Sequence, residues 1–445
     1  MDAKKIMQAA LAIQPEIQAN RRELHRHPEL GMDLVYTKAF VKTKLEEMGY
    51  VPQECGKSGL VVLAGGKKPG KCFLIRGDMD ALPVEEQANV EFRSQNPGKM
   101  HACGHDTHTA MMLGAAKLLK GMEDEIEGTV KLMFQPGEET LEGAQDMLAA
   151  GVLENPKVDA GLMIHSMTGM PFPKGMVAIL DGGRGMASCD QYKITVKGKG
   201  GHGAMPHLTI DPITAAAHIQ VGLAELHSRE LEPGTFGVVT TGMFHAGGAP
   251  NVIADNAVME GTIRTGDIKV EKMLMDRLTE IAKTIAKAYR CEADVEFVKH
   301  CPPMISDMEV GAATTKYMKE LLGDGAVPMS VIAPGNKVSG GSEDFAFISN
   351  EIPACALMLA TVGDDKENYA YPQHHPKANF NDEVLYEGTA SYVYVATRWL
   401  EVKNFKNRKR GNHYGKGICC CEQSAVVCPD RCGPGHYHRI CNYER

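Results

Sequence analysis

The chain has 445 residues, more than one ordinary hydrophobic core organises, so we expect two domains. With 43% hydrophobic and 23% charged residues, it has the composition of a folded globular protein rather than a disordered or fibrous one. Its net charge of −8 disfavours nucleic-acid binding, and no run approaches the roughly 20 apolar residues that cross a bilayer. We therefore expect no nucleic-acid and no membrane partner.

The first 13 residues form an amphipathic pattern that Gln8 interrupts, and they lack a convincing cleavage site. We interpret them as the start of a helix rather than a signal peptide, and we expect a cytoplasmic protein. The cysteines before the C-terminal tail are scattered singly, as is usual in a reducing compartment. They are Cys55, Cys72, Cys103, Cys189, Cys291, Cys301 and Cys355.

The N-terminal region is expected to begin with two helices, over residues 3–26 and 37–48. Pro28 and Gly49 mark their ends, because both residue types interrupt helices. A strand over residues 59–64 then follows, bounded by glycine turns.

A second strand, over residues 71–76, is an apolar run of the kind found in buried parallel strands. It leads directly to Asp78 and Asp80. Acidic residues at the end of a buried strand occupy the position where α/β enzymes place their chemistry. For either residue alone, a capping carboxylate in a turn is an equally good interpretation.

The block His101–His108 combines one thiol, three imidazoles and one carboxylate, and an apolar helical pattern follows it. Gly104 lies between Cys103 and His105, and its flexible backbone allows both side chains to face one point. Thiolate and imidazole suit zinc and its first-row neighbours. By itself, the spacing fits a buried thiol at a helix start at least as well.

Two later strands also end at potential ligands. The strand over residues 128–134 leads to Glu138 and Glu139, and the strand over residues 160–164 leads to His165. Since the carboxyl ends of parallel strands meet at one edge of a sheet, these side chains are expected to converge. The pattern predicts an α/β fold in which a mixed, mostly parallel sheet is flanked by helices.

Beyond residue 185 the pattern changes to β-α-β-β-α-β, the order of a ferredoxin-like domain. Its expected strands cover residues 191–196, 235–242, 257–264 and 291–298, and its helices cover 212–227 and 270–289. We predict an inserted lid or dimerisation domain that could pair two subunits. The predicted catalytic domain is split between residues 1–184 and 301–403, with the inserted domain over 185–300 and a tail over 404–445.

The resumed catalytic domain is expected to contain a helix over 311–322, a strand over 354–360 and a closing helix over 387–402. Between the last two lie His374 and His375, a potential last ligand or an ordinary surface turn. The potential ligands are Cys103, His105, Glu139, His165 and His374. Five are too many for one tetrahedral site and suit two open sites that share a bridging group.

These motifs resemble a family of co-catalytic metallohydrolases, which includes aminoacylases, hippurate hydrolases, indole-acetyl-amino-acid hydrolases and N-acetyl-diaminopimelate deacetylases. The resemblance extends from Arg21 to about Lys403. Its markers are Arg76–Pro83, His101–His108, Phe134–Glu139, Gly198–His202, Asn251–Ile253 and Gly341–Phe345. In the wider family a His stands where this chain has Asp78, so the site should follow the branch with Cys103 and His105.

The resemblance implies a role for each site residue. The metal ligands are Cys103, His105, Glu139, His165 and His374, although His375 stands beside the last of these and the assignment between the two stays open. Glu138 is the general base, and Asp80 orients a ligand. His202 reaches the active site of a partner subunit and stabilises the oxyanion, while Asn251 and Arg264 face the substrate.

The implied enzyme is an amidohydrolase that binds two divalent ions per subunit (Zn, Mn, Co or Ni) and assembles as a homodimer or homotetramer. It would cleave the amide of small N-acyl amino acids or similar conjugates through a metal-bound hydroxide, with Glu138 as the proton carrier. A metallo-dipeptidase or carboxypeptidase of the same fold is the main alternative. A non-catalytic metal-binding or ligand-binding protein is a third, but such a protein would have no use for Glu138.

The tail, residues 404–445, resembles nothing in that family. It is basic and contains Cys419, Cys420, Cys421, Cys428, Cys432 and Cys441 together with three histidines. A zinc knot is one interpretation, but the spacings match no usual pair of cysteine doublets. A disordered appendage, or residues translated beyond the true end, is the interpretation that we favour.

Overall fold

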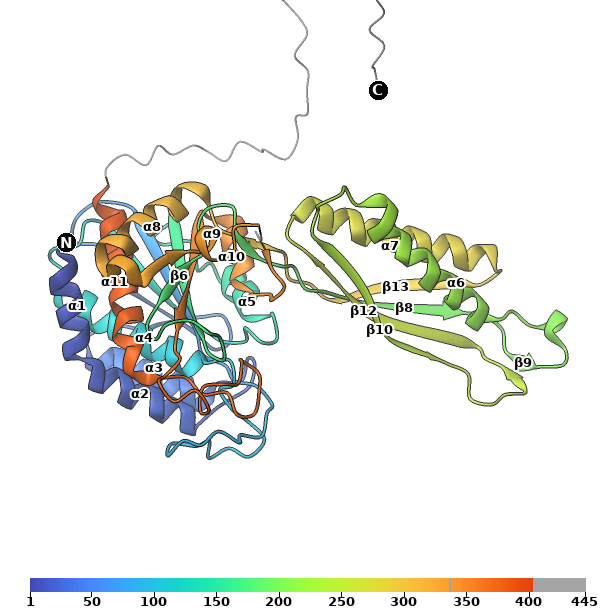
Figure 1. Cartoon of the computed structure of the whole chain (residues 1–445), viewed down its shortest axis with the longest axis horizontal. Helices are drawn as coiled ribbons and strands as arrows, with labels where there is room; N and C mark the ends of the chain where they lie inside the picture. Colours follow the sequence, from blue (N-terminus) through green and yellow to red (C-terminus); the bar gives the residue numbers. More distant parts are fainter. Residues whose placement is uncertain (336–337, 403–445) are drawn as a thin grey trace, which may run out of the picture. The chain divides into compact units, whose positions relative to one another are not determined.

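The computed structural model describes residues 1–335 and 338–402 (Figure 1). Its largest element is an eight-stranded sheet with the order β1-β2-β4-β3-β5-β17-β6-β15. In that order the strands are Gln53–Cys55, Gly59–Gly65, Thr129–Gln135, Cys72–Asp78, Ala160–Met167, Ala354–Ala360, Val177–Ile179 and Ala326–Pro328. The predictions for the tail concern residues outside the described range of the chain.

The centre of this sheet is parallel, because β4, β3, β5 and β17 run in one direction. Antiparallel pairs occur toward its margins, between β1 and β2, β2 and β4, and β17 and β6. Every residue of β3 is buried, as expected for a strand that helices cover on both faces. The predicted fold class, a mixed and mostly parallel sheet flanked by helices, is confirmed.

Helices cover the large sheet, and α4 packs against both α2 and α11. They are α1 (Ala3–Ala12), α2 (Gln14–Arg26), α3 (Val35–Glu47), α4 (His105–Gly121), α5 (Gly143–Ala149), α8 (Met308–Leu322), α9 (Met329–Ile332), α10 (Phe345–Glu351) and α11 (Leu385–Glu401). Short 3-10 turns cover Pro206–Leu208, Gly323–Gly325 and Asp382–Val384. Among the described residues, no helix is long and apolar enough to cross a membrane.

The single helix expected over residues 3–26 is wrong, because the chain forms two helices that are interrupted at Ile13. Pro15 lies in the first turn of the second helix. Proline has no N–H to donate to the preceding turn, and its ring clashes with the carbonyl four residues earlier. A continuous helix would place Pro15 in its interior, whereas a new helix tolerates it at the start.

A second, four-stranded sheet has the order β10-β12-β8-β13, and all its neighbours are antiparallel. In chain order its elements are β8 (Asp190–Lys197), α6 (Pro212–Glu225), β10 (Gly237–Ala246), β12 (Asn256–Thr265), α7 (Ile268–Ala288) and β13 (Glu292–Lys299). A π-helical turn at Leu226–Glu230 follows α6. This is the β-α-β-β-α-β arrangement predicted for a ferredoxin-like unit. The boundaries at 185 and 300 stay a prediction.

Two small sheets complete the described structure. One pairs β9 (Gly201–His202) with β11 (Val252–Ile253). The other has β7 at its centre, between β14 and β16. Its strands are β7 (Gly185–Met186), β14 (Met304–Ile305) and β16 (Val338–Ser339).

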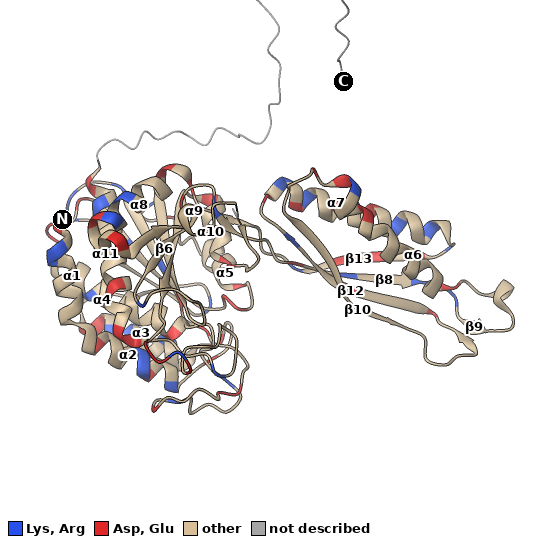
Figure 2. Ribbon diagram, viewed as in Figure 1, with Lys and Arg blue, Asp and Glu red and all other residues tan. Residues whose placement is uncertain are grey.

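The helix α7 is amphipathic, and Figure 2 shows acidic and basic residues mixed along it. Its buried residues Leu274, Leu278, Ala282 and Ala286 recur every four positions and form one apolar row. Such spacing places side chains on one face of a helix. Glu271 is also buried and begins this row, three positions before Leu274. A carboxylate therefore stands where the pattern calls for an apolar residue.

Candidate metal centre

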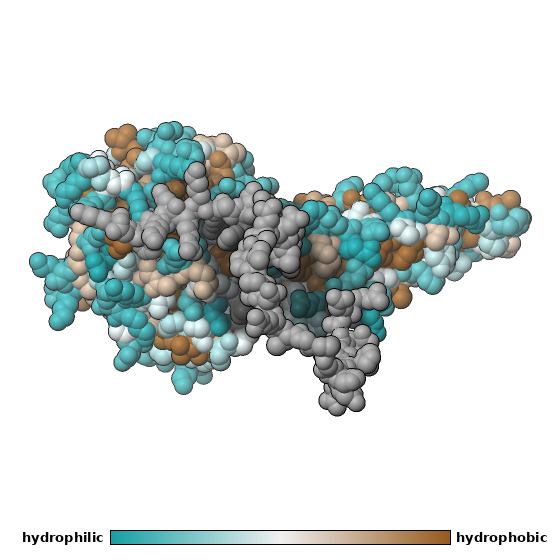
Figure 3. Space-filling model, turned by 90° about the horizontal axis from the view of Figure 1, so that it is seen from above, coloured by the Kyte–Doolittle hydropathy of each residue, from teal (hydrophilic) through white to brown (hydrophobic). Residues whose placement is uncertain are grey.

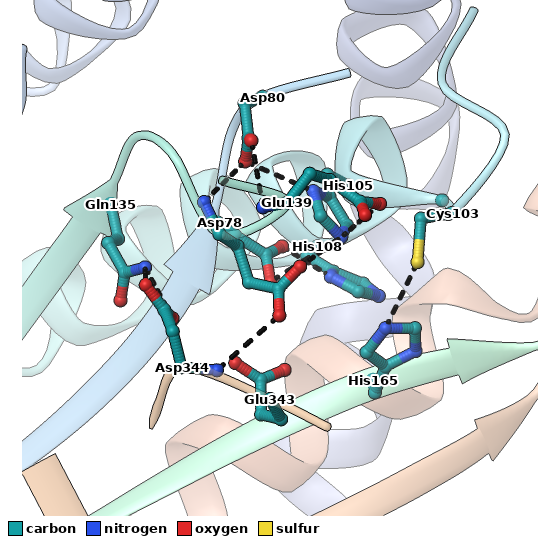
Figure 4. Close-up of polar contacts among 12 residues, drawn as sticks. Asp78, Asp80, Cys103, His105, His108, Gln135, Glu139, His165, Glu343 and Asp344 are labelled. Atoms are coloured by element: carbon teal, nitrogen blue, oxygen red, sulfur yellow. Dashed lines mark hydrogen bonds and ion pairs between the residues drawn. The ribbon is translucent and has the colours of Figure 1, made fainter. Parts of the chain in front are cut away.

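The candidate site lies where the parallel strands of the large sheet end. Asp78 is the last residue of β3, and Asp80 follows it. Glu138 and Glu139 come shortly after β4, and His165 lies within β5. Because β4, β3 and β5 are parallel neighbours, their carboxyl ends bring these side chains to one edge of the sheet (Figure 4).

Cys103 and His105 come from the loop that begins α4. Gly104, between them, has φ +91°, a left-handed conformation that favours glycine. A Cβ atom on Gly104 would lie 2.7 Å from Cε1 of Phe380. This position therefore requires glycine both for its backbone angle and for lack of space, and the resulting bend presents both neighbours to the same point.

The five residues predicted as ligands converge. The Sγ atom of Cys103 lies 3.5 Å from Nε2 of His165 and 3.3 Å from Nε2 of His374. Oε1 of Glu139 lies 3.5 Å from Nε2 of His374 and 3.9 Å from Nε2 of His105. Overlapping groups of three ligand atoms, all within 4.8 Å of one another, thus connect all five residues. Their role as ligands stays a prediction.

The structure separates His374 from His375. His374 directs Nε2 to Cys103 and Glu139. The ring of His375 instead stacks on Tyr371, with ring centroids 4.4 Å apart, and its Nδ1 accepts the backbone N–H of Lys377. Of the two histidines, only His374 is therefore oriented as the resemblance requires.

The side chains of this cluster fit a pair of cations. Nε2 of His105 and Oε1 of Glu139 are buried and have no hydrogen-bond partner among the described residues. Burial raises the pKa of the Cys103 thiol well above its ordinary value, and Glu139 raises it further. Buried polar atoms normally have hydrogen-bond partners. Cations bound between these side chains would interact with the unpaired atoms and would favour the thiolate form of Cys103. A thiolate, imidazoles and a carboxylate form a donor set suited to zinc and related metals.

Asp80 holds two segments of the cluster together. Its Oδ1 and Oδ2 atoms accept the backbone N–H groups of Glu138 and Glu139, at 3.0 and 3.1 Å. Oδ1 also lies 3.3 Å from Nδ1 of His105. Asp80 therefore orients the imidazole while it anchors the turn that carries the two glutamates, the arrangement expected of a residue that positions ligands.

Glu138 lies beside the predicted ligands and is 6% exposed. Its Oε2 atom is 3.8 Å from Nε2 of His105, and its Oε1 atom accepts the backbone N–H of Asp344 at 3.4 Å. Burial, together with the charge of Glu343, raises the pKa of Glu138 well above its ordinary value. A carboxyl group with a raised pKa at the edge of a cation site is suited to accept and release a proton.

Asp78 and His108 belong to the site, although the sequence pattern gives Asp78 only a position at a strand end and gives His108 no role. Nδ1 of His108 donates to Oδ1 of Asp78 at 2.5 Å, and its Nε2 accepts the N–H of Ser166 at 2.7 Å. Both ring nitrogens of His108 therefore have hydrogen-bond partners. The other carboxylate oxygen of Asp78, Oδ2, lies 3.7 Å from Nε2 of His105. The three-residue spacing from His105 to His108 on α4 is the signal available in the sequence.

The motif Gly341–Phe345, which the sequence offers only as a marker of resemblance, forms the wall behind Glu138. Nη2 of Arg76 lies 2.8 Å from Oε1 of Glu343 and 2.7 Å from Oδ1 of Asp344, and all three side chains are buried. Burial raises the pKa of Asp344 to about 7, although Arg76 acts in the opposite direction. These groups give Glu138 an acidic, buried surrounding.

The predicted residues of the smaller domain lie on two different regions of it. His202 is exposed in β9, opposite Val252 of β11, and its Nδ1 accepts the N–H of Ala204. The carbonyl of Asn251 accepts the N–H of Gly203, so Asn251 lies beside the same two-stranded sheet. Among the described residues, no hydrogen bond or ion pair joins this two-stranded sheet to the predicted ligands.

Arg264 lies near the end of β12, in contact with the large domain. Its Nη1 atom donates to Oγ of Ser342, and it lies 3.3 Å from the carbonyl oxygen of Ser188. Ser342 precedes Glu343 of the acidic wall. Arg264 therefore approaches the neighbourhood of Glu138, but its role toward a substrate stays a prediction.

Comparisons with known proteins identify the family. The model of Peptidase family M20/M25/M40 matches residues 74–398. IAA-amino acid hydrolase ILR1-like 4 of Arabidopsis thaliana is 38% identical over 386 residues, covering 85% of this chain and 84% of the relative. The hippurate hydrolase of Campylobacter jejuni is 36% identical over 393 residues, covering 88% and 98%.

A solved structure supports the same assignment. The YXEP protein of Bacillus subtilis, a dinuclear metal binding peptidase from the M20 family, matches with a TM-score of 0.73 and 33% identity. The match covers 88% of this chain and 99% of that protein. The strand-end cluster thus lies on a fold shared with a protein described as a dinuclear metal binding peptidase. The chain belongs to peptidase family M20/M25/M40 and is a hydrolase that acts on amide bonds.

Proposed function

We propose that this protein hydrolyses the amide bond of N-acyl amino acids or similar small amide conjugates, with two divalent metal ions per subunit. The observation that carries the proposal is the convergence of one thiol, three imidazoles and one carboxylate. Two of their atoms, Nε2 of His105 and Oε1 of Glu139, are buried without hydrogen-bond partners among the described residues, and Glu138 lies beside them. Relatives named for the hydrolysis of IAA-amino acids and hippurate support this substrate class.

The residues proposed to hold the ions are Cys103, His105, Glu139, His165 and His374. This mixed nitrogen, sulfur and oxygen set is compatible with Zn, Mn, Co or Ni. Bound there, such ions would act as Lewis acids and lower the pKa of water toward neutrality. Asp80 would hold His105 and the Glu138–Glu139 turn in position around these ions.

Glu138 is the proposed proton carrier. Its carboxylate would take a proton from the attacking water and deliver it to the nitrogen of the leaving amine. His202, contributed by a partner subunit, would donate a hydrogen bond to the oxyanion of the tetrahedral intermediate, a contact of about 3–4 kcal/mol. Asn251 and Arg264 are proposed to bind the substrate.

The proposed assembly is a homodimer or homotetramer that pairs through the ferredoxin-like unit, in the cytoplasm. The exposed apolar residues of this unit support the proposal, and Figure 3 shows brown apolar side chains on its surface. The exposed apolar residues of the unit include Met205, Leu208, Val238, Met243, Phe244 and Val252. Larger groups of exposed apolar side chains often mark protein interfaces.

A release assay tests the proposed reaction. Acetyl-, benzoyl-, indole-acetyl- and aminobenzoyl-amino acids and a set of dipeptides are incubated with the protein, loaded in turn with Zn²⁺, Mn²⁺ or Co²⁺, before and after chelation. We expect chelator-sensitive release of the free acid from at least one acyl-amino acid. Faster cleavage of dipeptides would favour the metallo-dipeptidase or carboxypeptidase alternative, and no cleavage of any amide would favour a binding protein.

The variant Glu138→Gln tests the mechanism. We expect it to retain its metal ions but to lose activity by about a hundredfold to ten-thousandfold, since it can no longer accept a proton. Glu142→Gln, at an exposed position just beyond the same turn, is the matched control and should remain active. Full activity of the Glu138 variant would refute its role as the base.

A further inference from the structure

A second cluster of potential ligands lies apart from the strand-end site, where the chain enters and leaves the ferredoxin-like unit. Asp190 is the first residue of β8, and His300 directly follows β13. The two strands pair, with Lys299 opposite Gln191. Glu271, at the start of the buried row of α7, is the third member. The cluster thus joins three elements of one unit.

The three side chains are close enough to share a ligand. Nδ1 of His300 lies 2.6 Å from Oδ1 of Asp190 and 3.7 Å from Oε1 of Glu271. One ligand atom from each residue lies within 4.8 Å of the others. The side chains of Asp190 and Glu271 are 0% and 3% exposed, whereas that of His300 is 46% exposed. The cluster therefore consists of one partly exposed imidazole in contact with two buried carboxyl groups.

Two buried oxygens of this cluster lack a partner outside the two carboxyl groups. Apart from each other's carboxyl groups, Oδ2 of Asp190 and Oε1 of Glu271 have no hydrogen-bond partner among the described residues. An unpaired buried carboxylate is costly, and two of them side by side repel each other. Two arrangements relieve this cost: a proton shared between the carboxyl groups, or a cation bound by both of them.

We propose that Asp190, Glu271 and His300 form a binding site for a divalent first-row transition metal ion, separate from the catalytic pair. One imidazole nitrogen and two carboxylate oxygens suit zinc, cobalt or manganese, with water in the remaining position. An imidazole ligand disfavours calcium and magnesium, which prefer oxygen alone. Binding would connect the first strand of the unit, its last strand and α7.

The competing arrangement, a proton shared between the two carboxyl groups, requires Glu271 to be protonated. Burial, reinforced by the charge of Asp190 and by a hydrogen bond between the two carboxyl groups, raises the pKa of Glu271 to about 9, so without a cation this carboxyl group keeps its proton at neutral pH. A metal ion must displace that proton, and binding should therefore strengthen as the pH rises.

Metal counting separates the two arrangements. The full-length wild type, Glu271→Gln and His300→Gln are dialysed against the same Co²⁺ buffer, freed of unbound ion and analysed for cobalt per chain. Asp276→Asn, on the exposed face of α7 where it pairs with Lys272, is the matched control. We expect both cluster variants to bind one ion fewer per chain than the wild type and the control.

Cobalt absorption identifies which ion is lost. Of these two sites, only the strand-end site includes a thiol, that of Cys103, so an ion bound by Asp190, Glu271 and His300 contributes nothing to a sulfur-to-cobalt charge-transfer band. The cluster variants should keep this band while they lose one ion. Unchanged cobalt content in the cluster variants would overturn the proposal in favour of the shared proton. Loss of the ion together with the charge-transfer band would also overturn the proposal, because the lost ion would then belong to the strand-end site. If Glu271→Gln fails to fold, His300→Gln, at a half-exposed position, decides.

Discussion

Nε2 of His374 lies 3.3 Å from Sγ of Cys103, although 271 positions separate the two residues in the chain. The backbone N–H of His374 also donates to the carbonyl oxygen of Ala102, at 2.8 Å. His374 has φ +67°, a conformation that costs a non-glycine residue roughly 1–2 kcal/mol. The surrounding contacts hold this strained residue in place, as is common at functional sites.

The adjacent histidines provide a matched pair of variants. We expect His374→Ala to lose metal and to lose activity by at least about tenfold to a hundredfold, because it removes a side chain directed at Cys103 and Glu139. His375→Ala should keep both, since that ring stacks on Tyr371. Metal content per chain and the rate of amide hydrolysis are the measurements. Equal losses in the two variants would contradict the assignment.

Asp80→Asn should loosen the site without unfolding the protein. An asparagine offers one acceptor oxygen in place of two, so it cannot satisfy the N–H groups of both Glu138 and Glu139. We expect a loss of about tenfold to a hundredfold in metal affinity, measured by competition with a chelator, at unchanged circular dichroism. Asp33→Asn, at a position whose side chain is 80% exposed, is the control. Wild-type affinity in Asp80→Asn would show that the anchor is dispensable.

Gly104→Ala should destabilise the protein through two effects that a control can separate. The left-handed backbone costs about 1–2 kcal/mol for alanine, and the new Cβ would lie 2.7 Å from Phe380, which adds about 1–3 kcal/mol. Gly98 has φ +75° but open space around it, so Gly98→Ala measures the backbone effect alone. Chemical denaturation of both variants in chelator provides the comparison. Equal destabilisation would mean that Phe380 moves aside freely.

Glu387 should make stability depend on pH. Burial raises its pKa to about 7, its Oε2 atom has no hydrogen-bond partner among the described residues, and the unfolded value is near 4.5. Because the folded state favours the protonated form, this stabilisation is complete below pH 4.5 and is lost as the pH rises through 7. The loss is on the order of 1–3 kcal/mol.

Glu387→Gln removes this titration. Its free energy of unfolding should therefore rise relative to the wild type as the pH increases from 5 to 8, measured by denaturation at several pH values. Glu367→Gln, at an exposed position, should follow the wild-type curve. Parallel curves for Glu387→Gln and the wild type would contradict the burial argument.

Local chemistry makes much of this protein predictable. The spacing of Cys103, Gly104 and His105 restricts where two ligand atoms can point, and the apolar strand before Asp78 indicates a buried strand with its polar end at the edge of a sheet. The β-α-β-β-α-β order likewise follows from periodicity and turn residues. These features depend on residues close together in the chain, where backbone geometry limits the choices.

Other features could not be predicted, because they depend on contacts between distant segments. The apolar pattern around Pro15 favours one long helix, although the missing N–H of this proline favours a new start. His108 receives no role from the sequence, since Asp78 and Ser166, which engage its two nitrogens, lie on neighbouring strands. No residue near Glu271 in the sequence indicates that Asp190 and His300 lie beside it in the fold.

The sequence by itself determined the family, the fold class and the chemical types gathered in the site, because strand periodicity and short motifs encode them locally. Only the tertiary structure decided that His374, rather than His375, turns toward Cys103, and that Asp190, Glu271 and His300 come together as a second group of potential ligands. The physical reason is that side-chain direction and burial depend on which strands and loops pack together, and segments hundreds of residues apart jointly set that packing.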